Sequence, residues 1–157
     1  MLYIHDSLLL QLQTDLHLLR WQWRGPMQLP AFQLAFNQLM NYSLRYGVTH
    51  MLADTSTMPP VGTREQAWLS EAWLPRARAM RLQHLALVLP ASLHNQLVVE
   101  HVVQDGRFYL DTQVHFFSDD YSALDWLANG EAVVAAMEHE WHSGRARSQP
   151  EGQLAGR

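Results

Sequence analysis

The chain has 157 residues, of which 48% are apolar and 17% charged, and its formal net charge is −4 with histidine neutral. This length predicts one domain with a sizeable core, and the acidic balance excludes the basic surface that nucleic-acid binding needs. The absence of cysteine excludes disulfides, thiolate catalysis and cysteine-bound zinc. The amino terminus has no secretory pattern and no apolar run is long enough to span a bilayer, so we expect a cytoplasmic protein.

The first elements expected are two strands joined as a hairpin. Residues 8–13 and 18–24 alternate in polarity with a period of two, which predicts strands with one buried and one polar face. Thr14-Asp15 is the expected turn between them, and Gly25-Pro26 ends the second strand.

A helix and a buried strand follow the hairpin. Pro30 suits the first turn of a helix, apolar residues recur at helical spacing as far as Leu44, and Gly47 is a natural stop. Residues 48–53 are short, apolar and β-branched at their start, which predicts a central strand.

A stiff loop and a second helix come next. Pro59-Pro60 forms the loop, and Thr63 with Gln66 matches a capping box at the start of the helix. Pro75 predicts that this helix is kinked or split near residue 74, because proline cannot donate the hydrogen bond that continues a helix.

The second half of the chain repeats the alternation of strand and helix. Residues 82–89 predict a strand covered on both faces, and Ser92 precedes the next helix. Residues 113–117 predict the last strand, after which Ser118-Asp119-Asp120 caps a short helix. One more amphipathic helix is expected as far as Trp141.

These elements define an α/β fold class with the order β-β-α-β-α-β-α-β-α plus a carboxyl-terminal helix. Right-handed crossovers between the strands predict a mixed, mostly parallel sheet of four to five strands flanked by helices. We expect a single domain over residues 1–142. Residues 143–157 are rich in glycine, serine, glutamine and arginine, and we expect them to form a disordered tail.

The order of the elements and several short motifs resemble the SpoIIAA-like, STAS/SEC14-type single-domain proteins of bacteria. The resemblance covers roughly residues 8–128. The segments that carry it are Trp23-Arg24-Gly25-Pro26, Leu52-Ala53-Asp54, Gln66-Ala67-Trp68-Leu69 through Trp73-Leu74-Pro75-Arg76, Leu85-Ala86-Leu87-Val88-Leu89-Pro90, and Phe116-Phe117-Ser118-Asp119 through Ala123-Leu124-Asp125-Trp126-Leu127.

The resemblance implies a STAS-like mixed sheet and a regulatory or interaction role without catalysis. Anti-sigma-factor antagonists of this type are switched by phosphorylation of a serine in an Asp-Ser-Ser-Gly-type motif at the start of the second helix. That motif is absent here, and of the nearest hydroxyls, Thr55, Ser56, Thr57 and Thr63, only Thr63 lies where a helix should begin. The SEC14 part of the family implies lipid binding, for which a long apolar gate helix is missing.

Polar side chains follow three of the predicted strands. Asp54, Thr55 and Ser56 end the third strand, Ser92 follows the fourth, and Asp119 follows the fifth. Because ligands of α/β proteins meet the carboxyl ends of strands, these residues are candidates for one ligand or partner site at the rim of the sheet. The alternative is that Asp54 and the hydroxyls bind loop amides and that Ser92 and Asp119 only cap helices.

The loop and helix after the third strand form a second candidate surface. Trp68 and Trp73 are five residues apart, about 140° around a helix, so both cannot lie centrally on one face. One of them, exposed beside Pro59 and Pro60 and close to Thr63, would be a typical interface anchor. The alternative is that both pack into a wide apolar face.

No catalytic, cofactor-binding or metal-binding residues are predicted. His139-Glu140-Trp141-His142 invites comparison with zinc helices, but the two histidines are three apart, whereas a helix that binds zinc places them four apart, and no further ligand is evident. The other histidines have no ligand spacing, and the chain has no nucleophile elbow, phosphate-binding loop or dinucleotide fingerprint.

Three functions remain open at this point. The preferred hypothesis is a non-enzymatic STAS-like domain that binds a protein partner or itself through residues 55–73. The second is a module that binds a small molecule or lipid in a pocket between the sheet rim and the Pro59-Pro60 loop, which a cavity in the core would favour. The third is an enzyme with Asp54 as acid or base, which needs a second titratable group nearby.

Overall fold

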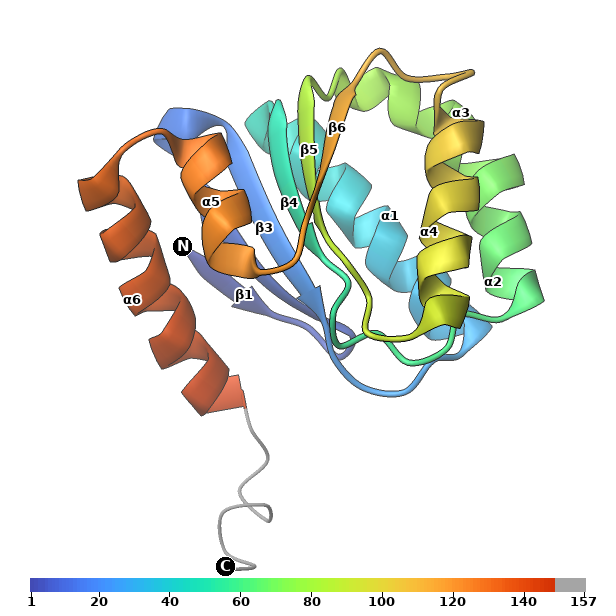
Figure 1. Cartoon of the computed structure of the whole chain (residues 1–157), viewed down its shortest axis with the longest axis horizontal. Helices are drawn as coiled ribbons and strands as arrows, with labels where there is room; N and C mark the ends of the chain where they lie inside the picture. The colour runs from blue at the N-terminus through green and yellow to red at the C-terminus, as the bar shows by residue number, and fades with distance from the viewer. Residues whose placement is uncertain (149–157) are drawn as a thin grey trace, which may run out of the picture.

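The computed structural model describes residues 1–148 and has one mixed sheet between two layers of helices (Figure 1). The strands are β1 Leu2–Ile4, β2 Leu8–Gln13, β3 Leu18–Trp23, β4 His50–Asp54, β5 His84–Val88 and β6 Gln113–Phe117. The main helices are α1 Leu29–Tyr46, α2 Thr63–Trp68, α3 Leu74–Ala77, α4 Leu93–Gly106, α5 Asp120–Ala128 and α6 Glu131–Ser148. None of the helices described in this range combines the length and the apolarity needed to cross a bilayer.

The strands lie side by side in the order in which they occur in the chain. β1, β2 and β3 pair antiparallel, and β3 to β6 pair parallel. Because parallel crossovers are right-handed, consecutive strand order carries every crossover helix to the same face. The apolar residues of α1, α3 and α4 accordingly join one core cluster, whereas those of α5 and α6 join a second cluster on the other face.

The α/β class is confirmed, and the number of strands is six where four to five were expected. The additional strand is β1, which pairs with β2 from Leu2 opposite Gln11 to Ile4 opposite Leu9. Three residues are too few for a period of two to be recognised. The terminal ammonium of Met1 holds this edge by donating to the backbone oxygen of Leu12 at 3.0 Å and to Glu140 at 3.1 Å.

The prediction that the hairpin has a polar face is wrong. Both faces of β2 and β3 are buried, and the side chains of Gln11 and Arg20 have no exposed area. Helices α5 and α6 cover the face of the hairpin that carries Arg20, and each supplies an acid that pairs with it. Arg20 therefore lies inside the protein although it is charged. The alternation of polar and apolar residues reflects only the polarity of neighbouring side chains. It cannot show that a helix 100 residues later in the chain covers the polar face.

Capping and helix interruption were predicted with mixed success. Asp119 and Ser92 do cap α5 and α4. The capping box does not form, because Thr63 is already the first helical residue and the cap position belongs to Gly62, without a side-chain hydrogen bond. The split before Pro75 is confirmed: a π-helical turn, Leu69–Trp73, separates α2 from α3.

The prediction of a disordered tail from Ser143 onward is wrong for residues 143–148, because α6 continues to Ser148. Trp141 is fully buried, and Gly144 is buried where an added Cβ would meet the side chain of Leu2. The glycine that suggested disorder is therefore the residue that lets the helix approach β1 closely. The rest of the predicted tail, residues 149–157, lies outside the described residues.

Candidate functional site

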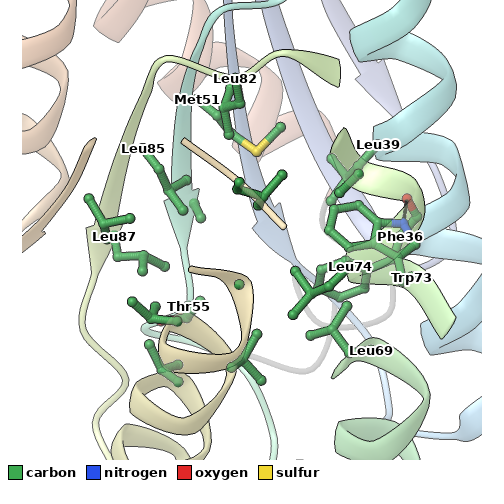
Figure 2. Close-up of a pocket in the computed structure, with 18 of the residues that line it drawn as sticks. Phe36, Leu39, Met51, Thr55, Leu69, Trp73, Leu74, Leu82, Leu85 and Leu87 are labelled. Atoms are coloured by element: carbon green, nitrogen blue, oxygen red, sulfur yellow. Dashed lines mark hydrogen bonds between the residues drawn. The ribbon is translucent and has the colours of Figure 1, made fainter. Parts of the chain in front are cut away.

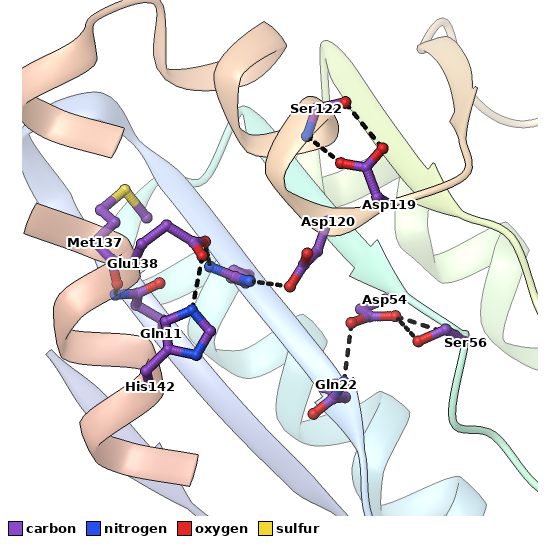
Figure 3. Close-up of polar contacts among 11 residues, drawn as sticks. Gln11, Gln22, Asp54, Ser56, Asp119, Asp120, Ser122, Met137, Glu138 and His142 are labelled. Carbon is purple, nitrogen blue, oxygen red and sulfur yellow. Dashed lines mark hydrogen bonds and ion pairs between the residues drawn. The ribbon is translucent and has the colours of Figure 1, made fainter. Parts of the chain in front are cut away.

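The carboxylate of Asp54, at the end of β4, accepts hydrogen bonds from β3 and from the loop that follows it. Asp54 is only 2% exposed; its Oδ2 accepts a hydrogen bond from Gln22 Nε2 at 2.9 Å, and its Oδ1 accepts from the backbone N–H and the hydroxyl of Ser56 at 3.0 and 2.6 Å (Figure 3). The hydroxyl of Thr55 donates to the backbone oxygen of Val88 at 2.5 Å. These contacts match the alternative in which the side chains after the strand satisfy local polar groups.

The polar residues after β4, β5 and β6 follow neighbouring parallel strands, as expected, but the helices that they cap lie on two different faces of the sheet. Ser92 accepts the N–H of Asn95 at 3.1 Å and caps α4, whereas Asp119 accepts the N–H of Ser122 at 2.7 Å and caps α5 on the opposite face. That backbone hydrogen bond, with a second from the Ser122 hydroxyl, lowers the pKa of Asp119. The strand order never reverses, so the sheet has no topological switch point, which is where ligands usually bind in open α/β sheets.

The two tryptophans after the Pro-Pro loop are both packed. Trp73 is 7% exposed and donates its indole N–H to the backbone oxygen of Phe36 at 2.9 Å, with the two rings 5.3 Å apart and edge to face. Trp68 is half-buried, with its ring 6.0 Å from that of Phe32. Trp73 is therefore part of the core, whereas Trp68 keeps a partly exposed side chain and Thr63 is exposed.

The loop itself is held by a residue that sequence reasoning missed. Asn95 is 2% exposed; its amide nitrogen donates to the backbone oxygens of Met58 and Pro59 at 3.1 and 3.0 Å, and its Oδ1 accepts the N–H of Val61 at 2.9 Å. An asparagine one turn into a helix gives no local signal of this role, because its partners lie more than 30 residues earlier. Pro60 stays exposed and Pro59 half-buried.

An apolar cavity of about 160 Å³ lies between the sheet and the helices that cover this face (Figure 2). Its main lining residues are Trp21, Met51, Ala53, Thr55, Leu85, Leu87 and Val114 of the sheet segment, Phe32, Phe36 and Leu39 of α1, Leu69, Trp73, Leu74 and Ala77 of the π-turn and α3, and Val98, Val99, Val102 and Val103 of α4.

Three small residues border the cavity, and one of its large residues is held in place by a hydrogen bond. Ala53 on β4, Ala77 on α3 and Gly106 on α4 all border the space and fill little of it. Trp73 cannot turn inward to fill it without losing its hydrogen bond to Phe36. Each of these residues is ordinary for its element, so only their juxtaposition in space produces the cavity.

Few polar groups border the cavity. The hydroxyls of Thr55 and Thr112 already donate to backbone oxygens, at 2.5 and 2.7 Å, and Arg107 is exposed at its margin. Trp21 is 3% exposed, and its indole N–H has no hydrogen-bond partner within residues 1–148. The lining therefore suits an apolar molecule.

Histidines meet on the opposite face of the sheet, where they affect stability. The rings of His50 and His84 are 4.9 Å apart on neighbouring strands. Burial, together with His84 and His17, lowers the pKa of His50 below its usual value of about 6.5. Because the unfolded chain binds this proton more readily than the folded protein, stability is retained above pH 6.5 and decreases as the pH falls through and below that value.

We therefore expect the melting temperature to drop by a few degrees between pH 7.5 and pH 5.5, with a smaller drop in His50→Gln. Thermal unfolding followed by circular dichroism at both pH values measures this. His101→Gln, at an exposed position on α4, is the matched control and should leave the pH dependence unchanged. An equal drop in His50→Gln would exclude His50 as its source.

The segment that invited comparison with zinc helices makes other contacts. His142 lies 3.1 Å from Glu138, and Glu140 pairs with the terminal ammonium. Within residues 1–148 no three histidine or acidic side chains are grouped so that they could hold a metal ion. No family model, curated protein or solved structure matches this chain.

Proposed function

We propose that this protein binds a small apolar molecule in the cavity between the sheet and helices α1, α3 and α4. The cavity, of about 160 Å³, is the observation that carries the proposal. Protein interiors are packed about as densely as organic crystals and hold few voids larger than a water molecule. A ligand that covers this apolar lining would remove it from water and so stabilise the folded chain.

The size and chemistry of the lining limit the ligand. Apolar cavities of about 150 Å³ stay dry and accept molecules such as benzene, so one aromatic ring or a short aliphatic chain would fit. The aromatic side chains of Trp21, Phe36 and Trp73 favour a ring.

A STAS/SpoIIAA-like topology is also part of the proposal. It is supported by the hairpin followed by parallel strands in consecutive order and by Thr63, which is exposed at the first position of α2. A regulatory role with a protein partner fits this topology. Its contact surface would consist of exposed residues such as Pro60 and Thr63, without Trp73.

The test compares binding of benzene by wild type and Ala77→Leu, which adds three carbons to a residue that borders the cavity. Benzene should raise the melting temperature of wild type in proportion to RT ln(1 + [L]/Kd). Ala77→Leu should lose at least tenfold in affinity. Ala72→Leu adds the same side chain at an exposed position of the π-turn and should bind like wild type.

Calorimetric titration of the three proteins with benzene gives the affinities directly. Wild type that shows neither heat nor a thermal shift near saturation with benzene would overturn the proposal. So would equal affinities of wild type and Ala77→Leu, because binding would then lie elsewhere.

A further inference from the structure

The two edges of the sheet differ in how they are protected. β1 has three residues and lies beside α6, whose Glu140 pairs with the Met1 ammonium and whose Gly144 packs on Leu2. β6 has five residues and runs along the opposite edge, and within residues 1–148 no strand pairs with its outer side (Figure 1). Its side chains are exposed or half-buried throughout, and Phe116 is 45% exposed.

The hydrogen bonds to β5 identify the groups of β6 that face outward. The N–H of Gln113 donates to Gln83 O, and the oxygen of Phe117 accepts from the N–H of Leu89, both at 2.9 Å. The backbone groups of odd-numbered residues therefore point toward β5. Since successive residues of a strand alternate, the N–H and C=O of Val114 and Phe116 point away from the sheet and have no partner within the described residues.

We propose that β6 pairs antiparallel with β6 of a second copy of this chain, about a twofold axis at His115. In this register Val114 lies opposite Phe116 of the second copy, and each such pair exchanges two hydrogen bonds. All eight outward groups of the two strands are then used, in four bonds. A shift of the axis by one residue either way would leave some of these backbone groups unpaired. The sheet formed by the two copies would have twelve strands.

The composition of β6 supports pairing with itself. Free edges are commonly protected by proline, lysine or inward charges, and the sequence Gln-Val-His-Phe-Phe has none of these. Valine opposite phenylalanine is a favourable cross-strand pair. Exposed aromatic residues flank the strand at both ends, Phe108 at 83% and Tyr121 at 55%, and an antiparallel arrangement brings the opposite ends of two copies together.

The absence of cysteine allows a direct test of the register. His115→Cys would place two thiols opposite each other at the axis, in a pair whose Cα atoms are about 4.5 Å apart and within reach of a disulfide. Gln113→Cys is the matched control, because its two thiols would be displaced by four residues along the strand, about 13 Å. Mild oxidation should cross-link His115→Cys at least tenfold faster than Gln113→Cys.

A second pair of variants tests the backbone bonds. Phe116→Pro removes an outward N–H without touching the ladder to β5, whereas Phe116→Val keeps that N–H. Sedimentation should show a dimer for wild type and Phe116→Val, and at least tenfold weaker association for Phe116→Pro, with unchanged circular dichroism.

Three results would overturn the proposal: monomeric wild type at every concentration reached, equal cross-linking of the two cysteine variants, or equal association of a folded Phe116→Pro and Phe116→Val. If Phe116→Pro does not fold, the cysteine pair decides alone. None of the substituted residues, Gln113, His115 and Phe116, lines the cavity, so these outcomes can be told apart from a failure of ligand binding.

Discussion

Replacing Arg20 by alanine is expected to destabilise the protein by about 3–5 kcal/mol, the usual loss when one partner of a buried ion pair is removed. The Arg20 side chain has no exposed area, and its two terminal nitrogens each lie 2.7 Å from a carboxylate, Asp120 on α5 and Glu138 on α6 (Figure 3). Its guanidinium also lies 4.1 Å above the ring of Trp141. The substitution leaves two acids without their cation and removes the contact that ties both helices to β3.

Equilibrium unfolding in urea measures this loss. Arg20→Lys should lie between wild type and Arg20→Ala, because one ammonium cannot engage two carboxylates in fork geometry. Glu140→Gln is the matched control: it breaks an ion pair whose two partners are 53% and 41% exposed, and we expect less than about 1 kcal/mol. A loss for Arg20→Ala as small as that of the control would show that the buried network contributes little.

Trp73→Ala is expected to destabilise the protein by about 3–5 kcal/mol, the range for removal of a buried aromatic side chain. The indole packs edge to face on Phe36, bonds to its backbone oxygen and forms one wall of the cavity. Truncation would therefore enlarge the cavity. Trp73→Phe keeps most of the volume and should lose about 1 kcal/mol with the hydrogen bond.

Trp68→Ala provides the comparison that separates burial from an interface role. Trp68 is half-buried, so its truncation should destabilise the chain clearly less than that of Trp73 when both are measured by urea unfolding. An exposed interface anchor would behave in the opposite way, with stability unchanged and association lost. Trp73→Ala that melts like wild type would revive Trp73 as an anchor and contradict its place in the core.

Local patterns were sufficient wherever the cause of a structure lies within a few residues. The hairpin strands, the buried strand before Asp54, the caps Ser92 and Asp119 and the split before Pro75 were all predicted from spacing or from one residue type. Each depends on backbone geometry that repeats every two to four residues. At the predicted rim the caps were located correctly, but local patterns did not show that their helices lie on opposite faces of the sheet.

The amino-acid sequence by itself thus determined the α/β class, most of the elements and the helix caps Ser92 and Asp119. Tertiary structure decided that Arg20 is buried, that α6 continues past Ser143, that Ser92 and Asp119 lie on opposite faces, and that a cavity opens beside Ala53 and Ala77. The physical reason is the same in each case. Burial, pairing and empty volume depend on residues such as Arg20 and Glu138, 118 positions apart, which no local period can bring together.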